Sequence, residues 1–250
     1  MKDNLEKEFL EYLQKNKTST TEELASVFYT SASTVRRKLT DMQSKGLVTR
    51  THGGVILNDV NNYIPSFSFR SHQNSLEKKK IALSSIKLIK NGNVIFLDGS
   101  TSAFFIAEYL TEFENIKVIT NGIDTLSLLS KHNIRAYSTG GEISRTNRSV
   151  LVGHYAENTV EKIHADIFFF SANSLDVNGE IYDYSERENA LREKMMKQAD
   201  KKVFLCDSTK LYNRATFKLC ELNDVDYLVS NKDIRPYFKT DKIPEIIFEL

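Results

Sequence analysis

Two short helical patterns within residues 19–54, STTEELASVFYTSASTVRRKLTDMQSKGLVTRTHGG, constrain the fold more than any other feature. Thr20 and Glu23 have the spacing of a capping box, in which side chain and backbone groups pair reciprocally at the helix start. The apolar face that follows consists of Leu24, Val27 and Phe28. A second helix is expected from Ser31 to Gly46, with apolar residues at Ala32, Val35, Leu39 and Met42. Two such helices joined by a tight turn predict a helix-turn-helix, whose second helix enters the DNA major groove.

Cations gather on the second helix and just after it. Between Thr34 and His52 there are five Lys or Arg residues and one acid, Asp41. Apolar runs on both sides of His52-Gly53-Gly54 predict a two-stranded hairpin, a wing that can lie against the sugar-phosphate backbone. The residues predicted to contact DNA are Ser33, Thr34, Arg36, Arg37, Lys38, Arg50 and His52. The alternative is a small helical domain whose basic face is exposed to solvent and binds nothing, because most charge runs are only solvated surface.

The composition is that of a globular protein, with 40% hydrophobic and 27% charged residues among 250. The formal net charge is only +1, so any contact with nucleic acid must be local. No apolar stretch approaches the roughly 20 residues that span a bilayer, and the charged N-terminus does not resemble a signal peptide. Cys206 and Cys220 lack metal-ligand spacing. We therefore expect a cytoplasmic protein with no membrane contact, no metal and no cofactor.

The remaining chain alternates between short apolar runs and helical patterns. Residues 58–69 are polar and contain Pro65, which predicts a linker between a domain at 1–57 and a domain at 70–250. The expected strands are Val94–Leu97, Lys117–Ile119, Arg135–Tyr137, Asp166–Phe170, Val203–Leu205 and Tyr227–Val229. The expected helices include Ala103–Leu110, Ile123–Ser130, Tyr155–Lys162 and Glu186–Ala199. This alternation predicts an α/β fold with a doubly wound, mostly parallel sheet. We expect Lys78, Lys79 and Lys80 to form a solvated face or a charge cluster near the linker, in preference to a second DNA site.

Four polar turns follow strands of this predicted sheet, where ligands of such folds bind. Their hydroxyls, amides and one lysine suit a phosphate, and Asp98 suits sugar hydroxyls. The predicted effector-binding residues are Asp98, Gly99, Ser100, Thr101, Ser102, Thr120, Asn121, Gly122, Gly140, Gly141, Asp207 and Lys210. Each turn alone is a weak signal, because a tight strand-to-helix turn needs Gly and Ser for its geometry.

Over nearly its full length the chain resembles the DeoR family of bacterial sugar-metabolism regulators. The resemblance rests on Ser33-Thr34-Val35-Arg36-Arg37, Gly46-Leu47-Val48, Glu77-Lys78-x-x-Ile81-Ala82, Leu97-Asp98-Gly99-Ser100-Thr101 and Asp207-Ser208-Thr209-Lys210. It implies a repressor with an N-terminal winged helix-turn-helix that binds double-stranded operator DNA, and a C-terminal sensor for a phosphorylated sugar. Lys38 and Ser102 depart from the family, which usually has Asp and Thr there. An activator remains an alternative. Because symmetric regulators bind two half-sites, we expect a homo-oligomer assembled through residues 70–250.

The predicted sensor also resembles ribose-5-phosphate isomerase, which provides a rival enzyme hypothesis. Residues 190–194 and 207–210 are similar to segments of that enzyme, whose catalysis uses two aspartates, a lysine and a glutamate. The corresponding positions here hold Phe170, Asn173, a residue near Tyr184, and Glu193. Only Glu193 matches, and neither Phe nor Asn can act as a base. We therefore expect a fold without catalysis. A plain DNA-architectural protein, the third hypothesis, leaves residues 70–250 unexplained.

Overall fold

The computed structural model describes residues 4–16, 18–44, 47–51, 54–57, 67–212, 215–241 and 243–248. Contacts along the chain divide it into two compact units, Met1–Arg70 and Ser71–Leu250. None of the helices in the described residues is both long and apolar enough to cross a membrane.

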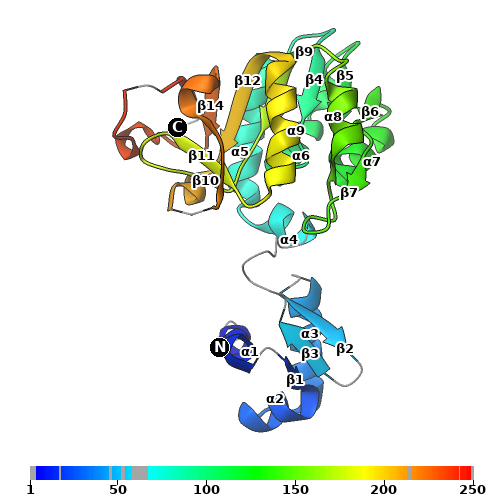
Figure 1. Cartoon of the computed structure of the whole chain (residues 1–250), viewed down its shortest axis with the longest axis vertical. Helices are drawn as coiled ribbons and strands as arrows, with labels where there is room; N and C mark the ends of the chain where they lie inside the picture. The colour runs from blue at the N-terminus through cyan, green and yellow to red at the C-terminus, as the bar shows by residue number, and fades with distance from the viewer. Residues whose placement is uncertain are drawn as a thin grey trace. The chain divides into compact units, whose positions relative to one another are not determined.

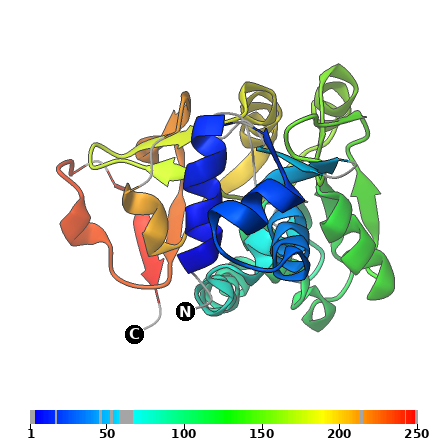
Figure 2. The same ribbon diagram turned by 90° about the horizontal axis from the view of Figure 1, so that it is seen from below.

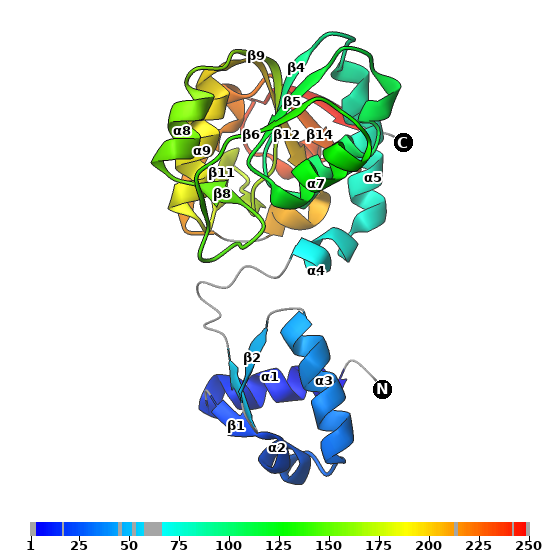
Figure 3. The ribbon, with the colours of Figure 1, turned by 90° about the vertical axis from the view of Figure 1, so that its right-hand side faces the viewer.

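The N-terminal unit consists of three helices and a small sheet (Figure 3). The helices are α1 Asn4–Asn16, α2 Thr21–Val27 and α3 Ala32–Ser44. The antiparallel sheet has the order β1-β3-β2, with β1 Thr18–Thr20, β2 Val48–Thr51 and β3 Gly54–Leu57. The predicted two-stranded hairpin, β2 and β3, is therefore confirmed. A third strand, β1, pairs with β3 and was not predicted, because its three residues are too few to show an alternating pattern in the sequence.

Most residues of the predicted apolar faces form the core of this unit, but Val27 is exposed on α2. Its buried side chains come from all three helices and two strands: Phe9, Leu13, Leu24, Val35, Leu39, Met42, Val48, Val55 and Leu57. The capping box is also present, because Glu23 N donates to Thr20 Oγ1 at 3.0 Å and Thr20 N donates to Glu23 Oε2 at 3.4 Å. Gly46, expected to end α3, lies outside the described residues.

The second unit is built on a seven-stranded sheet in the order β15-β14-β12-β9-β4-β5-β6, in which all neighbours are parallel (Figure 1). Its strands are β4 Val94–Leu97, β5 Lys117–Thr120, β6 Ala136–Ser138, β9 Ala165–Phe170, β12 Ala199–Cys206, β14 Tyr227–Ser230 and β15 Glu245–Phe248. Seen from below in Figure 2, the red β15 and the green β5–β6 region lie on opposite sides of the unit. The six predicted strands are confirmed, and β15 was not expected.

Helices cover both faces of this sheet, as expected for a doubly wound fold (Figures 1 and 3). One face packs against α5 Ser75–Ser85, α6 Thr101–Ala107 and α7 Ile123–Lys131. The other packs against α8 His154–Val160 and α9 Glu186–Lys197. Alternate side chains of β9 enter the two cores, with Ile167 and Phe169 on the first face and Phe168 and Phe170 on the second. This burial on both sides explains the continuous apolar run of β9.

Short elements complete the described part of the unit. An antiparallel sheet has the order β10-β11-β13, and β7 pairs with β8. Their bounds are β7 Glu142–Ile143, β8 Leu151–Val152, β10 Ser174–Leu175, β11 Glu180–Asp183 and β13 Phe217–Glu221. Single turns of 3₁₀ helix are η1 Ile86–Leu88, η2 Leu110–Glu112, η3 Ser208–Tyr212, η4 Leu222–Asp224 and η5 Arg235–Tyr237. None of these strands was predicted.

Two local predictions need correction. The linker was expected to extend to residue 69, but Phe67–His72 form helix α4, while residues 58–66 lie outside the described residues. Lys78 was expected on a solvated face with Lys79 and Lys80. Instead Lys78 is buried and its Nζ donates to Gln73 O at 2.7 Å, because this face of α5 packs inward.

Candidate DNA-reading face and effector site

The exposed face of α3 carries most of the residues expected to contact DNA. Val35 and Leu39 are buried, which leaves Ser33, Arg36 and Arg37 exposed to solvent. Ser31 Oγ accepts a hydrogen bond from Thr34 N at 3.2 Å at the start of the helix. The Ser31 hydroxyl also lies 2.9 Å from the hydroxyls of Ser33 and Thr34. The helix therefore begins with a cluster of hydroxyls and continues with two arginines.

The arginines differ in their surroundings. Arg36 Nη2 lies 3.7 Å from Glu22 Oε1, and both side chains are exposed. Arg37 has no ion pair among the residues that the structure describes. Arg50, on the wing strand β2, donates from Nη1 to Thr40 Oγ1 on α3 at 3.1 Å. This bond joins the wing strand β2 to the exposed face of α3.

Lys38, which is predicted to contact DNA, forms ion pairs within the unit. Its Nζ lies 2.8 Å from Glu6 Oε2 on α1 and 3.6 Å from Asp41 Oδ2, and its side chain is only 17% exposed. The helical turn places this residue beside α1, so Lys38 joins two helices of the unit. His52, the last residue predicted to contact DNA, lies outside the described residues.

Tyr29, which sequence reasoning missed, occupies the turn between α2 and α3. Thr30 N donates to Ala25 O at 3.0 Å and Tyr29 N donates to Ser26 O at 3.4 Å, the two bonds of a Schellman motif. Tyr29 therefore holds the left-handed position of that motif, with φ of 47°. Glycine is the usual residue there, and a side chain costs about 1–2 kcal/mol. The signal in the sequence that could have drawn attention to Tyr29 is an aromatic residue in the turn between two helical patterns.

In the second unit, the predicted effector-binding turns meet at one edge of the sheet. They follow β4, β5, β6 and β12, and the carboxyl ends of parallel strands lie at the same edge. The strand order runs outward in both directions from the adjacent β4 and β9, so this pair marks the topological switch point. Asp98 N donates to Phe169 O at 3.1 Å across it. The structure therefore brings the predicted residues to the edge where open α/β sheets bind ligands.

Asp98 is buried at this switch point, and protein groups occupy its carboxylate. Oδ1 accepts from Ser100 N at 3.0 Å, and Oδ2 accepts from Ser171 N at 3.2 Å and from Arg192 Nε at 2.9 Å. These three donors hold the β4 turn in place. The predicted role of Asp98, accepting bonds from sugar hydroxyls, stays a prediction.

Arg192 links Asp98 to two further carboxylates. Its Nη1 lies 2.9 Å from Asp183 Oδ2, and its Nη2 lies 3.4 Å from Glu188 Oε2. Burial alone would lower the pKa of this guanidinium, but the charges of Asp183, Asp98 and Glu188 raise it above its ordinary value. In the sequence, Arg192 stands out only as part of the segment similar to the isomerase. Its neighbours in the chain do not indicate that its partners lie on β11 and next to β4.

The turns after β4 and β5 touch each other through glycine. A Cβ on Gly122 would lie 3.0 Å from Gly99 Cα, and a Cβ on Gly99 would overlap the Val150 side chain. Beside this contact, three buried side-chain oxygens have no hydrogen-bond partner within the described ranges: Ser102 Oγ, Asn121 Oδ1 and Thr125 Oγ1. An unpaired buried polar atom costs about 1–3 kcal/mol, so a ligand that pairs with these atoms is favoured.

The turn after β12 supplies the cation expected for a phosphate. Lys210 Nζ donates to Ser171 Oγ and lies 4.0 Å from Asp207 Oδ2. Burial tends to raise the pKa of Asp207, but Lys210, Thr209 and Lys78 outweigh it and lower the pKa. Asn74 Nδ2 donates to Thr209 Oγ1 at 3.0 Å, which ties this turn to the start of α5. Lys78 thus contributes a second positive charge near the turn. The sequence did not indicate this, because Lys78 stands in a run of three lysines.

The backbone conformation at Gly140 and Gly141 favours glycine. Their φ values are 66° and 103°, in the left-handed region. A Cβ on Gly141 would also lie 2.6 Å from Val152 O. The φ values and this contact support the interpretation that the turn needs glycine for its geometry.

Three of the residues at the isomerase-like positions differ in their surroundings. Phe170 is buried in the core, Asn173 Nδ2 donates to Asp183 Oδ1 at 2.8 Å, and Glu193 is exposed on α9. In the described part of the chain, no three His, Cys, Asp or Glu side chains are grouped as a metal site would require.

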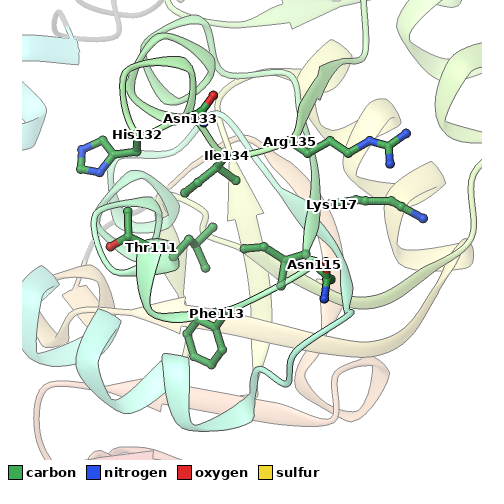
Figure 4. A pocket seen from close by; sticks show the side chains of 10 residues that line it. Thr111, Phe113, Asn115, Lys117, His132, Asn133, Ile134 and Arg135 are labelled. Atoms are coloured by element: carbon green, nitrogen blue, oxygen red, sulfur yellow. The ribbon is translucent and has the colours of Figure 1, made fainter.

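A surface hollow of about 580 Å³ lies at the opposite edge of the sheet (Figure 4). Lys117, at the start of β5, and Arg135, just before β6, line it together with Ile134. None of the predicted effector residues lines this hollow. The candidate effector site is therefore placed by the unpaired buried oxygens at the carboxyl edge and not by this hollow.

A winged helix-turn-helix joined to an α/β unit of this kind defines a transcriptional regulator that binds DNA. Residues 6–61 match the family model described as "DeoR-like helix-turn-helix domain", and residues 73–232 match "DeoR C terminal sensor domain". The chain belongs to the DeoR family.

Two relatives agree with this assignment. The HTH-type transcriptional repressor GlcR of Bacillus subtilis is 30% identical, over 89% of this chain and 86% of the relative. The L-fucose operon activator of Haemophilus influenzae is 30% identical, over 85% of each chain. A structure of ribose 5-phosphate isomerase A from Methanocaldococcus jannaschii has a TM-score of 0.42 at 19% identity and covers 55% of each chain.

Proposed function

We propose that this DeoR-family regulator is a repressor of carbohydrate-metabolism genes and that a phosphorylated sugar releases it from operator DNA. The observation that carries the proposal is the set of unpaired buried oxygens of Ser102, Asn121 and Thr125, at the same sheet edge as the Lys210 ammonium. Hydroxyl and amide groups with a lysine suit a ligand that carries both hydroxyls and a phosphate. The names of relatives, which include a repressor and a fucose operon activator, support regulation of sugar genes.

Within this proposal, residues 1–57 bind DNA and residues 70–250 bind the effector and assemble a homo-oligomer. Ser33, Arg36, Arg37 and Arg50 contact the operator. Asp98 acts indirectly, since its oxygens already accept bonds from Arg192 and two backbone amides. The protein then acts in the cytoplasm, where such an effector and operator DNA occur together.

The test uses the full chain and double-stranded DNA that it selects from a random-sequence pool. A thermal-shift screen against sugar phosphates, with the matching free sugars as controls, should find a ligand that raises the unfolding temperature. That ligand should then lower the affinity for the selected DNA. A ligand that tightens DNA binding would instead indicate an activator, and stabilisation by free sugars alone would contradict the phosphate site.

A further inference from the structure

We propose that Tyr29 contacts operator DNA, with its hydroxyl donating a hydrogen bond to a backbone phosphate beside the start of α3. The first observation is its strained backbone. Tyr29 has φ of 47° in the Schellman turn that ends α2. The other described non-glycine residues with positive φ are all asparagines, the type that tolerates this conformation best: Asn74, Asn115 and Asn133. A bulky aromatic residue is the exception, and such outliers concentrate at functional sites.

Packing within the protein does not explain the aromatic ring. Tyr29 is 98% exposed, whereas its neighbour Phe28 packs its ring 4.9 Å from Phe9 and 5.7 Å from Tyr12. The hydrophobic contact of this turn therefore comes from Phe28. The Tyr29 side chain strains the backbone and buries almost no surface in return.

The position of the turn points to DNA as the partner. In a helix-turn-helix, the first residues of the recognition helix lie closest to the DNA, and the preceding helix crosses the backbone. Tyr29 lies between α2 and α3, two residues before the Ser31 hydroxyl that caps α3. Tyrosine hydroxyls are frequent donors to phosphate oxygens, and such contacts set orientation without reading sequence.

Two substitutions in the full chain separate the hydroxyl from the ring. Tyr29→Phe keeps the ring and removes the donor, and Tyr29→Gly removes the side chain and relieves the strain. We expect Tyr29→Phe to bind the selected DNA about 5-fold more weakly and Tyr29→Gly about 10-fold or more. The loss should be similar for specific and unrelated DNA, with an unchanged salt slope, because a phenol releases no counterion. Tyr155→Phe, at an exposed tyrosine of α8, is the matched control.

Calorimetry of the same variants excludes an effect on folding. Tyr29→Gly should unfold at the same temperature as the parent or higher, because glycine adopts this φ readily. DNA binding by Tyr29→Phe equal to the parent's would overturn the hydroxyl contact, whatever Tyr29→Gly shows. A lower unfolding temperature for Tyr29→Gly would show that the ring supports the fold and would also overturn the proposal. Because the parent binds the DNA in every comparison, either result leaves the family's DNA-binding function intact.

Discussion

At the scale of single residues, neighbouring cations on α3 have different partners. Arg37 is exposed, whereas Lys38 is paired with Glu6 and mostly covered. One position along a helix turns the side chain by about 100°, which is enough to separate an exposed residue from one that joins two helices. The residues of the charge run Arg36-Arg37-Lys38 therefore differ in their surroundings.

Substitutions at this pair should separate binding from stability. Arg37→Ala should lower the affinity for the selected DNA by about 1–3 kcal/mol and leave the unfolding temperature unchanged. Lys38→Ala should leave that affinity near the parent's and destabilise the fold by about 1–3 kcal/mol, because the ion pair with Glu6 is mostly covered. Binding titrations and calorimetry measure both. The opposite pattern would return Lys38 to the DNA-contacting set.

Arg192 gives a second prediction at this scale. Arg192→Met leaves the carboxylates of Asp98, Asp183 and Glu188 buried without their common cation. We expect a loss of about 3–5 kcal/mol in the free energy of unfolding, measured by denaturant titration of the full chain. Arg187→Met is the control on the same helix, because its ion pair with Glu142 is exposed and contributes about 0–1 kcal/mol. An equal free energy of unfolding for the two variants would show that the buried cluster around Arg192 does not stabilise the fold.

At the scale of elements, caps and turns set where the helices lie. The capping box of α2 has additional partners, since Tyr12 on α1 donates to Glu23 Oε1 at 2.9 Å and Ser19 donates to Oε2 at 2.8 Å. One carboxylate thus connects α1, β1 and α2. Glu23 therefore links the start of the helix-turn-helix to α1 and β1.

This attachment predicts a dependence on pH. Hydrogen bonds from Ser19 and Tyr12 lower the pKa of Glu23 below its ordinary value of 4.5. A lowered folded-state pKa means that this stabilisation is present above the unfolded-state pKa and is lost as pH falls through the folded-state pKa. Glu23→Gln keeps the capping geometry and removes the charge. The difference in unfolding temperature between parent and Glu23→Gln should therefore shrink from pH 7 towards pH 3. A constant difference would mean that the charge contributes nothing.

At the scale of the whole molecule, the effector must act through a difference in affinity between DNA-binding and released states, typically about 1–3 kcal/mol of coupling. The candidate site lies at the switch point of the sheet, where the turns of β4, β5 and β12 converge. The β12 turn is hydrogen-bonded to Asn74 at the start of α5, only a few residues after α4. A ligand at Lys210 would therefore act next to the segment that leads to the DNA-binding unit in sequence.

Lys210→Ala tests this arrangement. Loss of the cation should leave affinity for the selected DNA unchanged and abolish release by the sugar phosphate that the parent responds to. Lys201→Ala is the matched control, because Lys201 is an exposed lysine near the opposite end of β12. Normal release by Lys210→Ala in a DNA-binding titration would show that the phosphate lies elsewhere.

The sequence by itself determined the features that depend on neighbours in the chain. The capping box at Thr20 and Glu23, the buried face of Val35 and Leu39, and the continuous apolar strands of the parallel sheet all follow from local spacing. The polar turns at Asp98 and Asp207 were placed correctly at strand ends for the same reason. These patterns persist because helices and strands impose fixed periods on side chains.

Only the tertiary structure decided which distant groups meet. Asp98 and Arg192 are 94 residues apart, and their pairing gives Asp98 a structural role that its own turn does not reveal. Lys38 meets Glu6, and Lys78 lies near Asp207, because packing of helices covers one member of each charge run. Strands of two residues, such as β7 and β10, form through partners elsewhere in the fold. Local propensity is too weak to encode such contacts, which arise only when burial brings the partners together.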